Sequence, residues 1–301
     1  MGKKDNVVYI KDFLSDDYPQ YSIKSINSDN SAKKVDIITS GFPCQAFSVA
    51  GYRQGFKDKK GRGNHFFNTA KIIQILQPRA FMLENVKNLV GHDRGNTIKE
   101  IKKTVLELGY SYIQFFLNAK DHGNIPQNRE RTFIVGFRGE ADYSNNDSTK
   151  LKSILTHQFK IPEKIRLKKK IHDCINLDKQ LDKFYYNSDH QYFEELDGTM
   201  KCKDTIYQWR RVYVRENKSS VCPTLTANMG TGGHNVPLIR DSFGIRKLTP
   251  EECLAFQGFP RRFKFPEEMA QSHRYKQAGN SVAVPVVQRI AEEMVRVLLK
   301  N

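Results

Sequence analysis

The stretch VDIITSGFPC, residues 35–44, decides the fold that the sequence predicts. Its first six residues form a short apolar run typical of a buried strand, and Gly41 and Pro43 then break the run into a loop that carries Cys44. Cys44 is therefore expected just past the carboxyl end of a strand. Because free cysteines are among the most buried residues, Cys44 by itself fits a packed thiol better than a nucleophile.

Helices and strands alternate after this stretch. Helical spacing of apolar residues over 66–76 ends before Pro78, and the strand RAFMLENV follows. A second helical segment, over residues 96–108, precedes the strands YSYIQFFLNA and RTFIVGF. This alternation predicts a largely parallel α/β sheet, whose ligand sites lie beyond the carboxyl ends of the strands. Cys44 and Glu84 both fall at such ends.

The character of the chain changes in its middle. Residues 142–221 are polar, basic and rich in aromatic rings, as in KIRLKKKIH, KFYYNSDHQYF and YQWRRVYVRENK, which favours a separate, smaller domain that is mostly β or irregular. We assign residues 1–159 to a catalytic domain, residues 160–250 to this smaller domain and residues 251–278 to a hinge. Residues 279–301 contain an amphipathic helix that is expected to pack back on the sheet.

The composition excludes several classes of protein. No apolar run approaches the roughly 20 residues of a membrane span, and the first residues lack the apolar core of a signal peptide, so a cytoplasmic protein is expected. The five cysteines are far apart with no C-x-x-C pair, which indicates free thiols and no zinc site. With 49 Lys+Arg against 33 Asp+Glu, the net charge of +16 favours nucleic acid as partner, although a merely basic protein fits the charge equally well.

Three further side chains could join Cys44. The segment LENVKN places Glu84 near the end of a strand, and QNRER spaces Arg129 and Arg131 two apart, which on an extended segment turns both side chains to one face. A thiol, a carboxylate and two guanidinium groups could then converge. Without other motifs, the two arginines fit a surface strand that pairs with phosphates or carboxylates better.

Five blocks of the sequence carry a more specific signal. In chain order, GFPCQAFS, MLENVKN, NIPQNRER, RKLTPEECLAFQGFP and QAGNSVAVPVV resemble the signature blocks of the bacterial DNA (cytosine-5)-methyltransferases of restriction-modification systems. The resemblance runs from about residue 35 to the C-terminus, apart from the variable middle. It implies a Rossmann-like class I methyltransferase sheet with a smaller target-recognition domain. It also implies methyl transfer from S-adenosyl-L-methionine to carbon 5 of a cytosine in a specific short sequence of double-stranded DNA.

The resemblance also implies a role for particular residues. Cys44 would add to carbon 6 of the cytosine, Glu84 would protonate nitrogen 3, and Arg129 and Arg131 would hold the glutamate and the cytosine O2. The nucleotide would be flipped out of the duplex to reach them. No metal is implied. The implied cofactor contacts are Phe42, Pro43, Asn280, Ser281 and Val282, and the implied DNA contacts are Gln45, Ser48, Arg62, Thr224, Thr226, Gly232 and Gly233.

The sequence departs from the family's pattern at its start. Family members open with a Phe-x-Gly-x-Gly turn followed about 20 residues later by an acidic residue for the ribose, whereas Gly2 and Gly41 are the only glycines before Cys44. We therefore expect the N-terminal strands of the sheet to be missing, which would leave the strand over 35–40 with an unpaired edge. His65 also stands at a position that is usually apolar in the family.

Several interpretations of this departure stay open. The chain could be a truncated form of a longer protein, one subunit of a split enzyme whose partner carries the glycine-rich block, or a circular permutant, and full activity is expected to need the missing segment or subunit. The alternatives to an active enzyme of this kind are a catalytically inactive DNA-binding protein and a tRNA cytosine-5 methyltransferase. In the middle domain, YQWRRVYVREN could read base edges through arginine, or Trp209 could belong to a small core.

Overall fold

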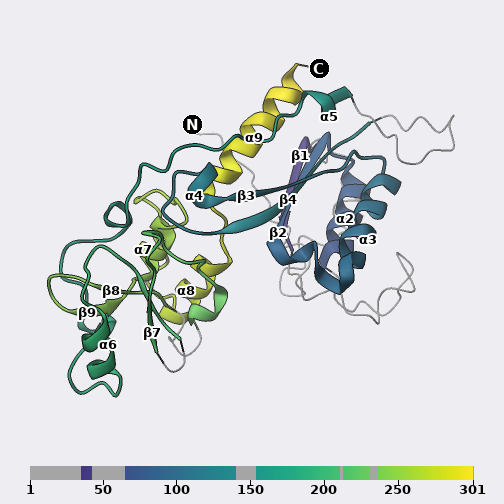
Figure 1. The fold of residues 1–301 in the computed structure, drawn as a ribbon. Helices are drawn as coiled ribbons and strands as arrows, with labels where there is room; N and C mark the ends of the chain where they lie inside the picture. Colours follow the sequence, from purple (N-terminus) through teal and green to yellow (C-terminus); the bar gives the residue numbers. More distant parts are fainter. Residues whose placement is uncertain (1–34, 43–64, 140–153, 211–212, 231–235, 301) are drawn as a thin grey trace. The chain divides into compact units, whose positions relative to one another are not determined.

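The computed structural model describes residues 35–42, 65–139, 154–210, 213–230 and 236–300 (Figure 1). The chain divides into two compact units. Unit 1 comprises Met1–Phe116, Arg131–Lys160 and Met294–Asn301, and unit 2 comprises Leu117–Glu130 and Ile161–Glu293. These units are defined by compactness, so the assignment of catalytic, recognition and hinge segments stays a prediction.

A four-stranded sheet organises the first part of the chain, with the strand order β1-β2-β4-β3 (Figure 1). Strand β1 (Ile37–Gly41) pairs in parallel with β2 (Ala80–Val86), and Gly41 lies opposite Glu84. The strands β3 (Ile113–Asn118) and β4 (Glu130–Phe137) complete the sheet. Each of the four strands expected between residues 35 and 137 is therefore present.

The expectation of a largely parallel sheet needs a correction at β4. This strand runs antiparallel to β2, with Glu84 opposite Phe133 and Val86 opposite Arg131. The link from β3 to β4 contains only the single helical turn α4 (Ala119–His122), whereas a parallel return needs a longer crossover, usually a full helix. The local pattern of a strand gives its existence but not its direction.

Two helices cover the apolar sheet residues of unit 1. Helix α2 (His65–Leu76) ends at Gln77 before Pro78, and α3 (Asn96–Glu107) ends before Gly109, whose φ of 82° is the left-handed conformation that favours glycine at a helix C-terminus. Their apolar faces pack into one core with the strands. The core includes Ile38, Phe42, Phe66, Ile73, Phe81, Leu83, Ile101, Val105, Tyr110 and Ile134.

Short helices connect these elements. They are η5 (Lys87–Leu89), η6 (His92–Gly95) and α5 (Ile154–Gln158). The long C-terminal helix α9 (Val284–Leu299) runs from unit 2 into unit 1, where Arg79 donates to the carbonyl of Leu298 at 2.5 Å and Arg296 to that of Gln158 at 2.6 Å. No helix among the described residues combines the length and the apolar character that a membrane span requires.

Unit 2 contains a second sheet with the strand order β5-β9-β8-β6-β7. Its strands are β5 (Tyr185–Tyr186), β6 (Tyr207–Trp209), β7 (Val214–Glu216), β8 (Leu238–Arg240) and β9 (Ile245–Lys247), and every recorded pairing is antiparallel. The helices are η7 (Ile171–Cys174), η8 (Asp182–Phe184), α6 (Phe193–Thr199), η9 (Ala227–Gly230), α7 (Pro250–Ala255) and α8 (Gln271–Asn280). Short strands and helical turns explain why the sequence of this region shows no long periodicity.

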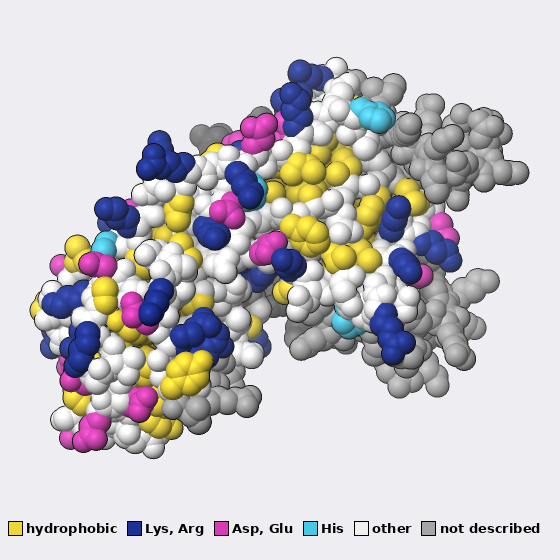
Figure 2. Space-filling view, in the orientation of Figure 1, with side chains coloured by type: hydrophobic (Ala, Val, Ile, Leu, Met, Phe, Trp, Pro, Cys, Tyr) yellow, Lys and Arg dark blue, Asp and Glu magenta, His cyan; other side chains and the backbone are white. Residues whose placement is uncertain are grey.

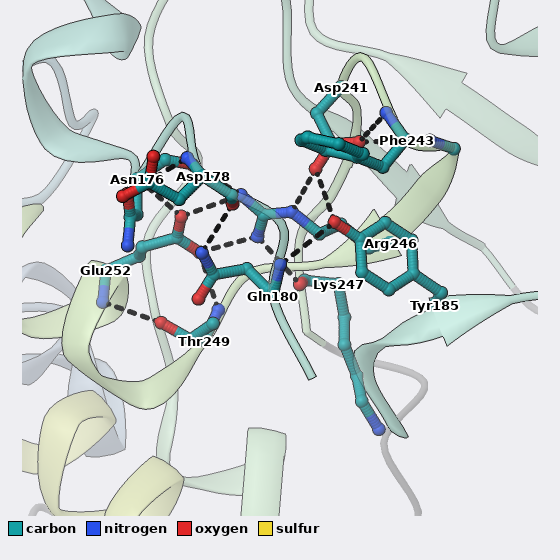
Figure 3. Close-up of polar contacts among 11 residues, drawn as sticks. Asn176, Asp178, Gln180, Tyr185, Asp241, Phe243, Arg246, Lys247, Thr249 and Glu252 are labelled. Carbon is teal, nitrogen blue, oxygen red and sulfur yellow. Dashed lines mark hydrogen bonds and ion pairs between the residues drawn. The ribbon is translucent and has the colours of Figure 1, made fainter. Parts of the chain in front are cut away.

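A buried arginine joins the second sheet to the helix that follows it (Figure 3). The Arg246 side chain, which is 0% exposed, contacts Asp241 through Nε at 2.6 Å and Glu252 through Nη1 at 2.8 Å. Glu252 also accepts from the backbone N–H of Thr249 and closes a capping box at the start of α7. The guanidinium thus fixes the angle at which the chain leaves β9 for α7.

Charged side chains of both signs lie on the face of the molecule that Figure 2 draws. Figure 2 shows Lys and Arg side chains distributed over the drawn face, with Asp and Glu between them. This distribution accompanies the net charge of +16. A net positive charge of this size favours attraction to a polyanion.

Candidate active site

The carboxyl ends of β1 and β2 form the first part of the candidate site. Gly41 is paired with Glu84, and a Cβ atom built on Gly41 would lie 3.5 Å from Glu84 Oε2. The neighbouring Asn85 donates from Nδ2 to the carbonyl oxygen of Phe42 at 2.6 Å. The Phe42 ring packs against Phe66 with the ring centroids 5.5 Å apart. The backbone is therefore fixed where β1 ends, two residues before Cys44.

Glu84 is held from the other side by Arg131. The Nε atom of Arg131 lies 3.0 Å from Glu84 Oε1, and the two side chains are only 14% and 16% exposed. Burial lowers the pKa of the Arg131 guanidinium, and the contact with Glu84 acts in the opposite direction. The structure thus brings together two of the expected catalytic side chains as an ion pair across adjacent strands.

Arg129 has a different set of recorded contacts, all within unit 2. Its Nη1 donates to the carbonyl of Leu225 at 2.8 Å, and its Nη2 donates to the carbonyls of Gly279 at 3.2 Å and Ser281 at 2.6 Å. One guanidinium therefore joins the blocks NIPQNRER and QAGNSVAVPVV to the segment PTLT. A direct role for Arg129 on the cytosine stays a prediction.

Two buried glutamines extend this junction. Gln127 donates to the carbonyl of Phe256 at 2.5 Å and accepts from the backbone N–H of Leu225 at 3.3 Å, while Gln257 donates to the carbonyl of Ala278 at 3.1 Å. Both glutamines are fully buried. We call Gln127, Arg129, Leu225, Gln257 and residues 278–281 the block junction, because four of the sequence segments singled out above meet there.

The block junction depends on one close approach between helices. A Cβ atom on Gly279 of α8 would lie 2.2 Å from the carbonyl carbon and oxygen of Thr226, which immediately precedes η9. Real Cβ atoms do not come this near to a backbone group, so glycine is required here on steric grounds. Thr226 and Arg129 thereby sit against the same turn at the end of α8.

Two of the residues expected to contact DNA, Thr224 and Thr226, lie in the part of the chain that the structure describes. Thr224 donates to the carbonyl of Asn128 at 2.6 Å, and both threonines line a polar cavity of about 360 Å³. The remaining expected contacts lie outside the described residues, as do the nucleophile and one cofactor residue. They are Gln45, Ser48, Arg62, Gly232, Gly233, Cys44 and Pro43.

The comparison with known proteins identifies the chain at this point. A family model described as "C-5 cytosine-specific DNA methylase" matches residues 3–296. The chain belongs to this family. Methyl transfer from S-adenosyl-L-methionine to carbon 5 of cytosine in DNA is therefore its enzyme class, as the resemblance of the five blocks predicts. The match includes residues before β1, and a missing N-terminal block is not confirmed.

Curated relatives agree with this assignment, and solved structures agree with the fold. The type II methyltransferase M.Bsp6I of Bacillus sp. (strain RFL6) is 54% identical over 266 residues, which cover 88% of this chain and 80% of the relative. The type II methyltransferase M.SsoII of Shigella sonnei is 38% identical over 288 residues, covering 94% and 69%. A mutant of the Spodoptera frugiperda DNMT2 matches with a TM-score of 0.59 at 18% identity, covering 87% and 80% of the two chains. S. pombe Dnmt2 matches with a TM-score of 0.56 at 16% identity, covering 88% and 77%. These structural matches confirm the Rossmann-like methyltransferase fold.

The described cofactor residues fit S-adenosyl-L-methionine in part. Asn280 has an exposed side chain that can donate and accept, and Val282 is half-buried beside it. Ser281 is already used by the protein, because its hydroxyl donates to the carbonyl of Ala278 and its own carbonyl accepts from Arg129. Ser281 thus shapes the turn that presents its neighbours. Contacts of Phe42, Asn280 and Val282 with the cofactor stay predictions.

Sequence reasoning missed three residues that support the site. Asn85, Gln127 and Gln257 lie inside the quoted blocks, and each acts by holding a backbone carbonyl. Amide side chains buried among apolar residues need such partners. An amide next to a candidate catalytic residue, as in LENVKN, was the available signal for Asn85.

Proposed function

We propose that this methylase acts on a cytosine flipped out of a specific duplex sequence and uses Cys44 as its nucleophile. One observation carries the proposal: the Glu84 carboxylate is fixed by Arg131 at the strand end that leads into Cys44. Two residues of extended chain span at most about 7 Å, so the anchored Phe42 limits how far the thiol can lie from this carboxylate.

The two oxygens of Glu84 have different surroundings, which suits an oriented acid. Oε1 contacts Arg131, while Oε2 faces the Gly41 end of β1. A cytosine that lies beside the GFPC segment would present nitrogen 3 to the second oxygen. Arg131 then acts as a positioning residue, because it restricts the carboxyl group to one orientation.

The proposed reaction uses these groups in order. The Cys44 thiol gives up its proton to the Glu84 carboxylate and its sulfur forms a bond to carbon 6, the electron pair of the 5,6 double bond becomes available at carbon 5, and Glu84 passes the proton on to nitrogen 3. S-adenosyl-L-methionine, when bound, supplies an electrophilic methyl group. Carbon 5 would take that methyl group, with the bonding pair left on the cofactor sulfur, and would later lose its proton to a base. Nitrogen 3 would return its proton to Glu84 as the bond from carbon 6 to the Cys44 sulfur breaks and the 5,6 double bond re-forms.

Four cysteines lie among the described residues, and three of them are poor candidates for the nucleophile because they are buried. Burial raises the pKa of the Cys174 thiol to about 12 and raises that of Cys222 and Cys253 well above the ordinary value. Cys202 is exposed and therefore provides a matched control. Substitution of Cys202 removes an accessible thiol that lies outside the proposed mechanism.

DNA binding is proposed for residues of both units. Gln45, Ser48 and Arg62, which follow the nucleophile in the chain, would contact the DNA as the flipped base is enclosed. Thr224, Thr226, Gly232 and Gly233 would contact the DNA from the target-recognition segment. Support for the second group comes from the cavity that Thr224 and Thr226 line, since its described lining carries arginines and no carboxylate.

The four-stranded sheet is proposed to need one more strand next to β1 to complete the cofactor site and give full activity. Among the described residues, β1 has β2 as its strand neighbour and is the last strand in the order of the sheet. The free edge of a parallel sheet strand is a site for strand addition. The added strand would come from the residues before Val35 or from a second chain.

The test is a methylation and trapping assay with the pure 301-residue chain. A duplex with 5-fluorocytosine at the target position should give a covalent adduct that survives denaturation when the methyl donor is present. Cys44→Ala should abolish the adduct and methyl transfer, Glu84→Gln should severely reduce methyl transfer, and Cys202→Ala should change neither. An adduct in Cys44→Ala would contradict the proposal. Robust turnover by the chain alone would refute the need for a second chain, and tight DNA binding without an adduct would favour an inactive DNA-binding protein.

A further inference from the structure

The polar cavity of unit 2 lies along one face of the β6–β7 hairpin. Its volume is about 360 Å³, and its lining includes Gln208, Arg210, Arg215, Asn217, Thr224 and Thr226. Among the described residues that line the cavity, the charged ones are Arg210 and Arg215. A hollow of this composition is complementary to a partner that is negatively charged and rich in hydrogen-bond acceptors.

The hairpin separates its two faces by simple strand alternation. Tyr207 and Trp209 pack with the small core that contains Leu196, Val214 and Leu238. Gln208 lies between them on the strand, so its side chain points to the opposite face, which is the face of the cavity. Trp209 therefore belongs to a small core, as one of the two interpretations of this segment expects, and base reading through arginine stays a prediction.

Gln208 and Arg215 form a pre-arranged pair on that outward face. They lie directly opposite each other in the pairing of β6 with β7, and Arg215 Nη2 donates to Gln208 Oε1 at 2.7 Å. Because a guanidinium group can only donate, this bond fixes which end of the amide is the oxygen. The amide NH₂ and the remaining guanidinium N–H groups are then left as donors. The pair thus presents an edge made of donors.

We propose that the Gln208–Arg215 pair reads the major-groove edge of a guanine in the target duplex. This inference rests on the proposed function, since it assumes a specific DNA substrate. Guanine offers two acceptors, O6 and N7, in the major groove, whereas adenine and cytosine each place a donor there and thymine a methyl group. A two-stranded ribbon such as β6–β7 fits the width of the major groove. Arg210 and the two threonines would contact the adjacent backbone.

Selection of binding sites tests the inference without relying on catalysis. The full chain and its variants select from a pool of randomised duplexes. Arg215→Ala should lose the preference for guanine at one position by roughly 10- to 100-fold and keep the rest of the motif. Arg215→Lys should fail to restore the preference, because lysine keeps the charge but lacks the planar fork. Arg262→Ala, which removes an exposed arginine elsewhere in unit 2, should leave the motif unchanged.

A base analogue gives a second measurement that does not depend on a variant's folding. Replacing the guanine by 7-deazaguanine removes one acceptor and keeps Watson–Crick pairing, so the unmodified protein should bind the analogue duplex at least several-fold more weakly. The Arg215→Ala variant should bind the guanine duplex and the 7-deazaguanine duplex with the same affinity, because it has already lost the side chain that contacts N7. An unchanged guanine preference in Arg215→Ala would overturn the inference. It would also be overturned if 7-deazaguanine weakened binding by the same factor in Arg215→Ala as in the unmodified protein, since the two changes would then act independently.

The two proposals can fail separately. Covalent trapping by Cys44 together with an unaltered motif in Arg215→Ala would refute the guanine assignment and leave the methyl-transfer proposal intact. A guanine preference that depends on Arg215, in a chain that forms no adduct, would support the assignment and refute the role of Cys44. Absence of any selected motif in the unmodified chain would refute the assignment.

Discussion

Arg131 and Glu84 form an ion pair diagonally across two antiparallel strands, with Nε and Oε1 3.0 Å apart. Glu84 lies opposite Phe133 in the register, so Arg131, two residues away, projects from the same face of the sheet. Strand pairing alone thus sets the distance between the two side chains. The orientation of the Glu84 carboxyl group is therefore set by the sheet and does not depend on the neighbouring loops.

Replacing Arg131 by methionine tests that relationship. The variant leaves Glu84 without its guanidinium partner in a mostly buried place, so the free energy of unfolding should fall by about 1–3 kcal/mol. The rate constant kcat of methyl transfer should fall by roughly 100-fold or more while KM for DNA changes little. Urea unfolding and steady-state kinetics measure the two effects. Arg138→Met, a change at an exposed arginine one residue beyond the same strand, should affect kcat little; an equal loss in both variants would contradict a specific role.

Substitution of Gly279 by alanine should be strongly destabilising. The new Cβ would lie 2.2 Å from backbone atoms of Thr226, so either α8 or the Thr226 segment must move. We expect a loss of about 3 kcal/mol or more in the free energy of unfolding. Gly198→Ala in helix α6 is the control, since nothing lies within 4 Å of its Cβ position. That change should be neutral or should stabilise by up to about 1 kcal/mol, and similar effects at both glycines would refute the steric argument.

The buried network around Arg246 should be sensitive to loss of one member (Figure 3). Arg246→Met leaves the carboxylates of Asp241 and Glu252 buried without their cation, and should cost about 3–5 kcal/mol in the free energy of unfolding. Glu251→Ala, which breaks a 3.6 Å contact with Arg274 at a side chain that is 45% exposed, should cost less than about 1 kcal/mol. Thermal unfolding of the two variants measures the difference. A small effect at Arg246 would show that the network relaxes or admits water.

His122 should make the protein less stable in mild acid. Burial lowers the pKa of the His122 imidazole, and the positive charges of Arg289 and Lys164 lower it further. The contact with Asn118 and the negative charge of Asp121 act in the opposite direction, but the pKa stays below its ordinary value. The folded state therefore prefers neutral His122, and the unfolded chain binds the proton more readily below its ordinary pKa of about 6.5. This contribution is fully present above that pH and declines as the pH falls below it. His122→Asn should flatten the decline in urea titrations between pH 7 and 5, and an undiminished decline in this variant would contradict the argument.

The sequence predicts the elements of unit 1 well for local reasons. Pro78 and Gly109 interrupt the helical pattern next to the points where α2 and α3 end, so the predicted and observed bounds agree within two residues. The direction of β4 could not be predicted in the same way, because the alternation of side chains is identical in parallel and antiparallel strands.

The contacts of the candidate site also differ in how far the sequence predicts them. The pairing of Glu84 with Arg131 follows once the strands are adjacent, and both residues belong to recognisable blocks. The recorded contacts of Arg129 could not be foreseen, because its partners Leu225 and Ser281 are 96 and 152 residues away in the chain and are contacted through backbone carbonyls that leave no trace in residue type.

The use of backbone atoms by Arg129 and Gln127 has a consequence for engineering new specificities. Both side chains hold Leu225 by its main-chain carbonyl and N–H, so these hydrogen bonds do not depend on the residue type, whereas the buried Leu225 side chain packs in the apolar core of unit 2. We expect a segment taken from a distant relative to keep these hydrogen bonds, provided that its chain follows the same path and places an apolar side chain at position 225. Changes in the other side chains of this segment are thereby compatible with the same main-chain attachment.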